Sequence, residues 1–230
     1  MALFAIGDPH LSFAADKPMD VFGPAWQNHA ERLREGFLGS VRSEDTVVLA
    51  GDLSWSMRLE DCGPDFRFLD GLPGQVKLIV KGNHDYWWTT AQKMERFFHQ
   101  QGLESLRLLH NNCWLYGDVA LCGTRGWFLE ERPQAQDEKL LRRECIRLEA
   151  SLRAAGEREK IVFLHYPPIY QGYQCPPILA LLRRYGVRRC YYAHLHGPAC
   201  RLAFQGERGG TEFFLISADY LGFVPKKILD

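Results

Sequence analysis

The stretch from Val76 to Asp85 reads VKLIVKGNHD, and it joins a predicted strand to a loop rich in reactive side chains. Its first part, Val76–Val80, is a short, mainly apolar run of the kind that forms a buried strand. Gly82 then permits a tight bend, and an amide, an imidazole and a carboxylate follow it directly. A buried strand that ends in such residues indicates a ligand site at its carboxyl end.

Five other short apolar runs end in the same way. They are rich in Val, Ile, Leu, Phe and Tyr and lack regular polar alternation, so we predict buried strands. These runs are Leu3–Ile6 before Asp8 and His10, Thr46–Ala50 before Asp52, Ile161–Leu164 before His165, Cys190–Ala193 before His194 and His196, and Glu212–Ile216 before Asp219.

Between several of these strands lie segments whose apolar residues recur with helical spacing. The predicted helices are Ala25–Leu38, Thr89–Gln101, Gln134–Ala155 and Pro176–Tyr185. A hairpin is expected around Gly117-Asp118, where two short apolar runs are joined by two turn residues. Strands that alternate with helices predict an α/β protein with mixed sheets covered by helices, and we expect residues 1–230 to form a single domain.

Composition restricts the class of protein. The 230 residues include 28 basic and 28 acidic side chains, so the formal net charge is zero. A protein with a dedicated nucleic-acid-binding region usually carries an excess of positive charge, so we do not expect such a region here. The seven cysteines form no Cys-x-x-Cys pair, which favours reduced thiols in a cytoplasmic protein. The first apolar run is too short for a signal peptide, and no stretch approaches a membrane span, so we expect no membrane partner.

Two of the strand-terminal motifs offer an aspartate as a candidate metal ligand. Asp8 and His10 are separated by one residue at a bend, so both can reach one ion, and such oxygen and nitrogen ligands suit Mn, Fe or Zn better than Ca or Mg. Asp52 follows a glycine and has two oxygens that can bridge a pair of ions. Taken alone, each motif is also typical of an ordinary turn.

The Gly82–Asp85 motif is more specific. The Asn83 amide oxygen can ligate a metal without adding charge, and His84 would then point at the substrate. Asp85 could hold the tautomer of that imidazole and stabilise its cationic form. The alternative is an Asx turn with incidental neighbours.

The histidines are distributed unevenly along the chain. Five of the eight, at 10, 84, 165, 194 and 196, directly follow predicted strands, which chance placement does not explain. The alternating pair His194 and His196 can serve two different ions. We interpret the other three, at 29, 99 and 110, as surface or packing residues.

In this order, the motifs resemble the calcineurin-like metallophosphoesterase superfamily. Its signature runs Asp-x-His, Gly-Asp, Gly-Asn-His-(Asp/Glu), a lone His and Gly-His-x-His, and the matching positions extend from residue 8 to residue 196. Ala193 departs from the usual glycine, and Pro9 is less usual within the first motif. Residues 17–26 and 123–127 resemble a bacterial subgroup of predicted phosphohydrolases with no named substrate.

The resemblance implies a four-layer α-β-β-α sandwich of two mixed sheets, of the metallo-dependent phosphatase type. It also implies two divalent ions per chain, Mn or Fe first and Zn, Co or Ni as alternatives. One ion would be held by Asp8, His10, Asp52 and His196, and the other by Asp52, Asn83, His165 and His194. Asp52 would bridge them.

The implied activity is hydrolysis of a phosphomonoester or phosphodiester by metal-activated hydroxide, with the substrate and the oligomeric state left open. His84 would protonate the leaving oxygen or stabilise phosphoryl charge, with Asp85 as its partner. Arg125, between two glycines in Gly123–Gly126, would bind a phosphate oxygen, unless it is a surface residue beside Trp127. The alternatives are a non-catalytic metal-binding scaffold of the same fold and a nuclease of the same superfamily.

Overall fold

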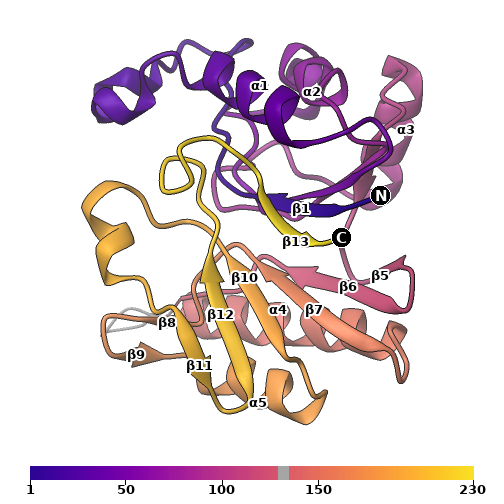
Figure 1. The fold of residues 1–230 in the computed structure, drawn as a ribbon, viewed down its shortest axis with the longest axis vertical. Helices are drawn as coiled ribbons and strands as arrows, with labels where there is room; N and C mark the ends of the chain where they lie inside the picture. Colours follow the sequence, from indigo (N-terminus) through magenta and orange to yellow (C-terminus); the bar gives the residue numbers. More distant parts are fainter. Residues whose placement is uncertain (129–134) are drawn as a thin grey trace. The chain divides into compact units, whose positions relative to one another are not determined.

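The computed structural model describes residues 1–128 and 135–230 (Figure 1). These residues form two compact units. Unit 1 comprises Met1–Leu108 and Ile216–Asp230, and unit 2 comprises Leu109–Leu215. Each unit contains one large mixed sheet with helices, which confirms the expected α/β class with two mixed sheets. The expected single domain stays a prediction.

The sheet of unit 1 has the strand order β13-β1-β2-β3-β4. Its strands are β1 (Leu3–Ile6), β2 (Thr46–Leu49), β3 (Val76–Ile79), β4 (Leu106–Leu108) and β13 (Lys226–Leu229). The first four strands run parallel, whereas β13 pairs antiparallel with β1. The carboxyl ends of β1, β2 and β3 therefore meet at the same edge of this sheet.

Three helices pack on one face of this sheet. They are α1 (His29–Ser40), α2 (Gly63–Asp70) and α3 (Ala91–Gln101), with short 3-10 segments at Met19–Phe22, Pro24–Trp26 and Leu59–Cys62. Alternate strand residues such as Phe4 and Val47 share one hydrophobic core with Phe37 of α1 and Phe66 of α2. The core forms because side chains at every second strand position point to the same face.

The sheet of unit 2 has the strand order β11-β12-β10-β7-β6-β5. Its strands are β5 (Cys113–Tyr116), β6 (Val119–Thr124), β7 (Glu159–Leu164), β10 (Arg189–Tyr192), β11 (Gly206–Arg208) and β12 (Thr211–Leu215). The four central strands are parallel, and β5 and β11 are antiparallel edges. The hairpin expected around Gly117-Asp118 is confirmed, because β5 and β6 pair across those residues.

Unit 2 also contains α4 (Ala135–Ala154), α5 (Pro176–Arg184), a 3-10 segment at Gly197–Leu202 and a small hairpin of β8 (Ile169–Tyr170) and β9 (Tyr173–Gln174). Leu148 of α4 and Leu182 of α5 pack against alternate residues of β6, β7 and β10. The helix expected at Gln134–Ala155 is confirmed as α4, and its expected first residue, Gln134, lies outside the described residues. No helix within residues 1–128 and 135–230 is both long enough and apolar enough to cross a membrane.

Some elements differ from the sequence expectation. The helix expected at Ala25–Leu38 is divided, because Asn28 adopts a left-handed backbone with φ 51° between a 3-10 turn and α1. Helix α2 was not expected, since Gly63-Pro64 is typical of a loop, yet proline is well tolerated in a first helical turn. Strand β13 was also missed, because its two lysines weaken the apolar signal of an edge strand.

Candidate metal centre

In unit 1, the predicted ligands lie on loops that follow three parallel strands. Asp8 and His10 follow β1, Asp52 follows β2, and Asn83 follows β3. Backbone hydrogen bonds hold the first two loops together, from the Asp8 nitrogen to the Gly51 oxygen at 2.9 Å and from the His10 nitrogen to the Asp52 oxygen at 2.9 Å. The position of each side chain is therefore set by a loop that is fixed to its neighbour.

Several predicted ligands share an uncommon backbone conformation. Asp8, His10 and Asp52 have φ values of 57°, 45° and 53°, and His194 of unit 2 has φ 75°. Non-glycine residues rarely adopt this left-handed region, although Asp and His do so more readily than most. These four make up half of the eight described non-glycine residues with positive φ. Such conformations concentrate at functional sites, where the surrounding structure compensates for their cost.

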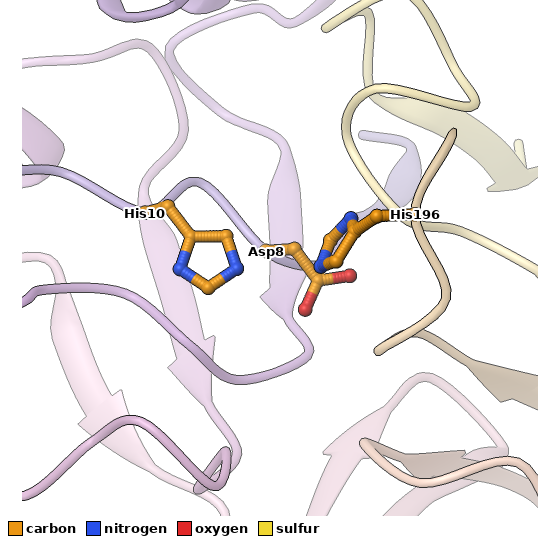
Figure 2. Close-up of side chains that lie close together, drawn as sticks. All are labelled: Asp8, His10 and His196. Carbon is orange, nitrogen blue, oxygen red and sulfur yellow. The ribbon is translucent and has the colours of Figure 1, made fainter. Parts of the chain in front are cut away.

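The carboxylate of Asp52 is held by two neighbouring loops. Its Oδ1 accepts a hydrogen bond of 2.7 Å from the backbone nitrogen of His84, and its Oδ2 lies 3.8 Å from Nε2 of His10. A Cβ added to Gly82 would come within 2.1 Å of Asp52 Oδ1, so only glycine fits there. Figure 2 shows Asp8 and His10 on the segment that follows β1, and a ligand atom of each lies within 4.8 Å of the other.

Asp85 is buried and fastens the same two loops. Its Oδ2 accepts hydrogen bonds from the backbone nitrogens of Asp52 at 3.0 Å and Gly82 at 2.6 Å. Its Oδ1 accepts from the Leu53 nitrogen at 2.8 Å and from Trp87 Nε1 at 3.1 Å. Sequence reasoning assigned Asp85 to the His84 imidazole, and that assignment stays a prediction. The contacts described here make Asp85 a positioning residue for Asp52.

The His84 ring lies among aromatic side chains of unit 1. Its Nδ1 lies 3.2 Å from the Tyr86 hydroxyl, and its ring centroid lies 4.5 Å from that of Trp55. The Trp55 ring in turn stacks on the predicted ligand His10, with centroids 5.0 Å apart and planes inclined by 18°. His29, interpreted as a packing residue, contacts Trp26 and Phe223, and burial lowers its pKa below the usual value.

In unit 2, the remaining predicted ligands follow two adjacent parallel strands. His165 comes directly after β7, and His194 and His196 come after β10. The Ala193 nitrogen donates a hydrogen bond of 3.1 Å to the His165 oxygen, which joins the two strand ends. The rings of His165 and His194 have centroids 5.1 Å apart, and a ring nitrogen of each lies within 4.8 Å of the other. This pair is close enough to ligate one ion.

Arg125 contacts the His165 segment through its backbone. Its carbonyl oxygen accepts hydrogen bonds from the nitrogens of His165 at 3.1 Å and Tyr166 at 2.9 Å. Its side chain is only 13% exposed, lies 3.4 Å from the buried Glu144 carboxylate and places the guanidinium over the Trp127 ring at 4.7 Å. The alternative sequence interpretation was a surface arginine beside a packed Trp127, and the low exposure of the Arg125 side chain does not fit a surface residue. Substrate binding by Arg125 stays a prediction.

The donor set agrees with the expected ions. Carboxylate oxygens, an amide oxygen and imidazole nitrogens together suit Mn, Fe or Zn, whereas Ca and Mg prefer oxygen ligands alone. A carboxylate and an imidazole at 3.8 Å, as for Asp52 and His10, can also form an ion pair.

A family model described as "Calcineurin-like phosphoesterase" matches residues 1–198. The chain belongs to the calcineurin-like phosphoesterase family. The matched stretch includes every residue that the sequence motifs assigned to the site, from Asp8 to His196. Members of this family are phosphoester hydrolases that typically bind two divalent metal ions, and their substrates are phosphate esters.

Solved structures support the same fold. A protein of unknown function, AQ665, from Aquifex aeolicus matches with a TM-score of 0.55 and 14% identity, over 98% of this chain and 95% of that one. The protein TT1561 of Thermus thermophilus matches with a TM-score of 0.52 and 15% identity, over 99% of this chain and 97% of that one. No curated protein matches the sequence. At these identities, the likeness concerns the fold alone.

Sequence reasoning about this calcineurin-like phosphoesterase missed two aromatic residues of unit 1. Trp55 lies three positions after Asp52, and Tyr86 lies two positions after His84, so both stood beside motifs that had been singled out. Their proximity to the motifs was the available signal. The stacking of Trp55 on His10 depends on two separate loops, however, and no local pattern describes such a contact.

Proposed function

We propose that this calcineurin-like phosphoesterase hydrolyses a phosphomonoester or phosphodiester with two divalent ions. The proposed ligands are the seven predicted residues, namely Asp8, His10, Asp52, Asn83, His165, His194 and His196, and Mn or Fe are the proposed ions. The observation that carries the proposal is the fixed carboxylate of Asp52, which faces His10 with one oxygen while the other is bound by the His84 backbone.

Asp52 is suited to bridge two ions. Its two oxygens are held in different directions, because Oδ1 accepts from the neighbouring loop and Oδ2 faces the imidazole of a second ligand. The Asp85 carboxylate fixes the Asp52 backbone by accepting a hydrogen bond from its nitrogen. Gly82 lacks a side chain and so leaves room for the Asp52 carboxylate. A ligand held in this way needs little rearrangement to bind, which favours affinity.

When bound, the two ions supply Lewis acidity, which makes a water nucleophilic near neutral pH and neutralises charge on the phosphoryl group. The chain itself contributes a proton donor. We assign this role to Nε2 of His84, because Nδ1 of that ring faces the Tyr86 hydroxyl. Protonated His84 would give its Nε2 proton to the leaving oxygen of the ester. The Trp55 ring, against which His84 packs, keeps the imidazole in place.

We also propose that the protein acts in the cytoplasm. No disulfide links any of the seven cysteines, and four of them, Cys62, Cys122, Cys175 and Cys190, are buried. Burial raises the pKa of the Cys62 and Cys122 thiols to about 12, which makes them poor nucleophiles. Buried reduced thiols of this kind are typical of proteins from a reducing compartment.

The test of the proposed function combines metal removal with a variant. Chelated protein should lose hydrolysis of para-nitrophenyl phosphate and bis(para-nitrophenyl) phosphate, and added Mn, Fe, Co, Ni or Zn should restore it. Asp52→Ala should abolish turnover and reduce the metal bound per chain, measured by elemental analysis. The control is Asp61→Ala, at an exposed carboxylate of the same unit, which should behave like the parent. Full activity in demetallated protein would contradict the proposal.

A further inference from the structure

Lys17 lies in unit 1, in the segment between β1 and the 3-10 turn Met19–Phe22. The residue is half-buried, and its ammonium lies over two aromatic rings, 4.1 Å from the centroid of Trp55 and 5.9 Å from that of Phe22. Trp55 is itself anchored, because its Nε1 donates to the Met19 sulfur at 3.1 Å. The position of the Lys17 stem is therefore defined by packing.

Lys17 has no acidic partner among the residues that the structure describes. Within residues 1–128 and 135–230, its ammonium takes part in no salt bridge, although Asp16 and Asp20 are close in sequence. The two cation–π contacts hold the ammonium in place without neutralising its charge. A cation kept in this state is available to bind an anion.

Trp55 places this cation beside the proposed reaction site. The ring that lies under Lys17 also contacts His84, with centroids 4.5 Å apart, and stacks on His10. Lys17 is thus separated by one side chain from both the proposed proton donor and a proposed metal ligand. It contacts neither of them, so a direct role in the chemistry does not follow from its position.

We propose that Lys17 is a specificity-determining residue that binds a second anionic group of the substrate, a phosphate or a carboxylate remote from the scissile bond. The inference rests on the proposed function, in which the two ions take up the charge of the scissile phosphoryl group. A further cation beside the reaction site, such as Lys17, then suits a substrate with a further negative charge. A lysine ammonium binds either kind of anion as a point charge.

The alternative is that Lys17 only covers Trp55. Lys17→Met separates the two roles, because methionine keeps an unbranched apolar stem on the indole and removes the charge. Lys17→Arg keeps the charge with a different geometry. Lys93→Met, at an exposed position of α3 in the same unit, is the matched control for removing one positive charge.

The kinetic experiment compares matched substrates with the manganese-loaded protein. One pair is para-nitrophenyl phosphate and its ring-carboxylated analogue, and the other is a hexose monophosphate and the corresponding bisphosphate. Lys17→Met should lower the preference in kcat/KM for the doubly anionic member by about tenfold to a hundredfold, the effect of losing one charged contact. Lys17→Arg should lose less of this preference, and Lys93→Met none. The pair that responds more strongly tells whether carboxylate or phosphate is recognised.

A binding experiment tests the same residue without turnover. Inorganic pyrophosphate should bind the metal-loaded parent more tightly than orthophosphate, measured by calorimetry, and Lys17→Met should remove most of that difference. The advantage of pyrophosphate should also shrink at high salt in the parent more than in Lys17→Met. If the parent hydrolyses no phosphate ester but Lys17→Met still weakens pyrophosphate binding, the proposed function fails and the role of Lys17 stands. Equal effects of Lys17→Met on both members of each pair, or no effect, would overturn the inference.

Discussion

The backbone nitrogen of Asp52 donates a hydrogen bond of 3.0 Å to the carboxylate of Asp85, which joins the loop after β2 to the loop after β3. The Asp85 carboxylate accepts three further hydrogen bonds, so its two oxygens are each engaged twice. A carboxylate is well suited to this position, because it accepts at both oxygens and donates at neither.

Replacing Asp85 tests this positioning role. In Asp85→Asn, one oxygen becomes an amide nitrogen that faces two donors, so we expect the free energy of unfolding to fall by roughly 3 kcal/mol. Because the same change releases the Asp52 loop, metal affinity should fall as well. Denaturant titration and metal titration measure the two effects, with Asp61→Asn as the exposed control. Normal stability and metal binding with a lower kcat would instead favour a role confined to His84.

The His84 side chain can be removed without disturbing Asp52. The hydrogen bond to Asp52 Oδ1 comes from the His84 backbone nitrogen, so His84→Ala should keep its bound metal. If Nε2 protonates the leaving oxygen, kcat should fall by about 10²–10⁴, and by less for esters with good leaving groups such as nitrophenol. Tyr86→Phe, which removes only the hydroxyl near Nδ1, should give a smaller loss. Equal losses for good and poor leaving groups would indicate electrostatic stabilisation.

Two readouts separate the possible roles of Arg125. Its guanidinium faces the Glu144 carboxylate, which is 1% exposed and also contacts Arg147, so Arg125→Ala should lower the free energy of unfolding by about 1–3 kcal/mol. Arg125→Lys should recover part of this loss. The exposed Arg142 on α4 supplies the control Arg142→Ala. A substrate contact would instead lower kcat/KM in both Arg125 variants, by roughly 1.5–3 kcal/mol, at unchanged stability.

The buried Lys77 predicts a pH dependence of stability. Burial lowers its pKa to about 8, although the Asp70 carboxylate acts in the other direction. Its ammonium donates to the backbone oxygens of Asp70 and Gly74 and to the Ser105 hydroxyl. Because the unfolded chain keeps the lysine protonated up to about pH 10.5, it binds more protons than the folded chain between pH 8 and 10.5.

The contribution of Lys77 to the free energy of unfolding should therefore rise with pH across this window, by an amount on the order of 1–3 kcal/mol. The measurement is denaturant unfolding of the parent and of Lys77→Met at several pH values. Other lysines and tyrosines titrate in the same range, so the informative quantity is the difference between the two slopes. Parallel slopes would show that Lys77 titrates alike in the folded and unfolded chains.

The strands and their reactive ends could be predicted from sequence. The run Leu3–Ile6 was expected as a strand and forms β1. Such strands can be recognised from sequence because the buried strands of a parallel sheet are continuously apolar. Gly82 was also singled out, but for its freedom to bend. The structure supplies a different reason, since the carboxylate of Asp52 occupies the space of a Cβ. Such a reason requires the neighbouring loop, which sequence alone does not provide.

The aromatic surroundings of the site could not be predicted. The contacts of Trp55 with Lys17 and His84 bring together residues from three separate loops, and no short-range periodicity encodes them. The hydrogen bonds that Asp85 accepts were not predicted for the same reason, because their donors come from two loops and a tryptophan. The motifs therefore indicated candidate residues for the chemistry, and tertiary packing determined what orients them.

The pairing of Leu3 with Leu229 spans almost the entire chain, because β13 returns to β1 after all of unit 2 has been traversed. On a ribosome, unit 2 is synthesised completely before the strand that finishes the sheet of unit 1 emerges. Until then, β1 presents an open edge to other nascent chains, which is a hazard for strands of this kind. Contacts so distant in sequence also close slowly. We therefore expect the nascent chain to depend on a chaperone until the segment Ile216–Asp230 has emerged and paired with β1.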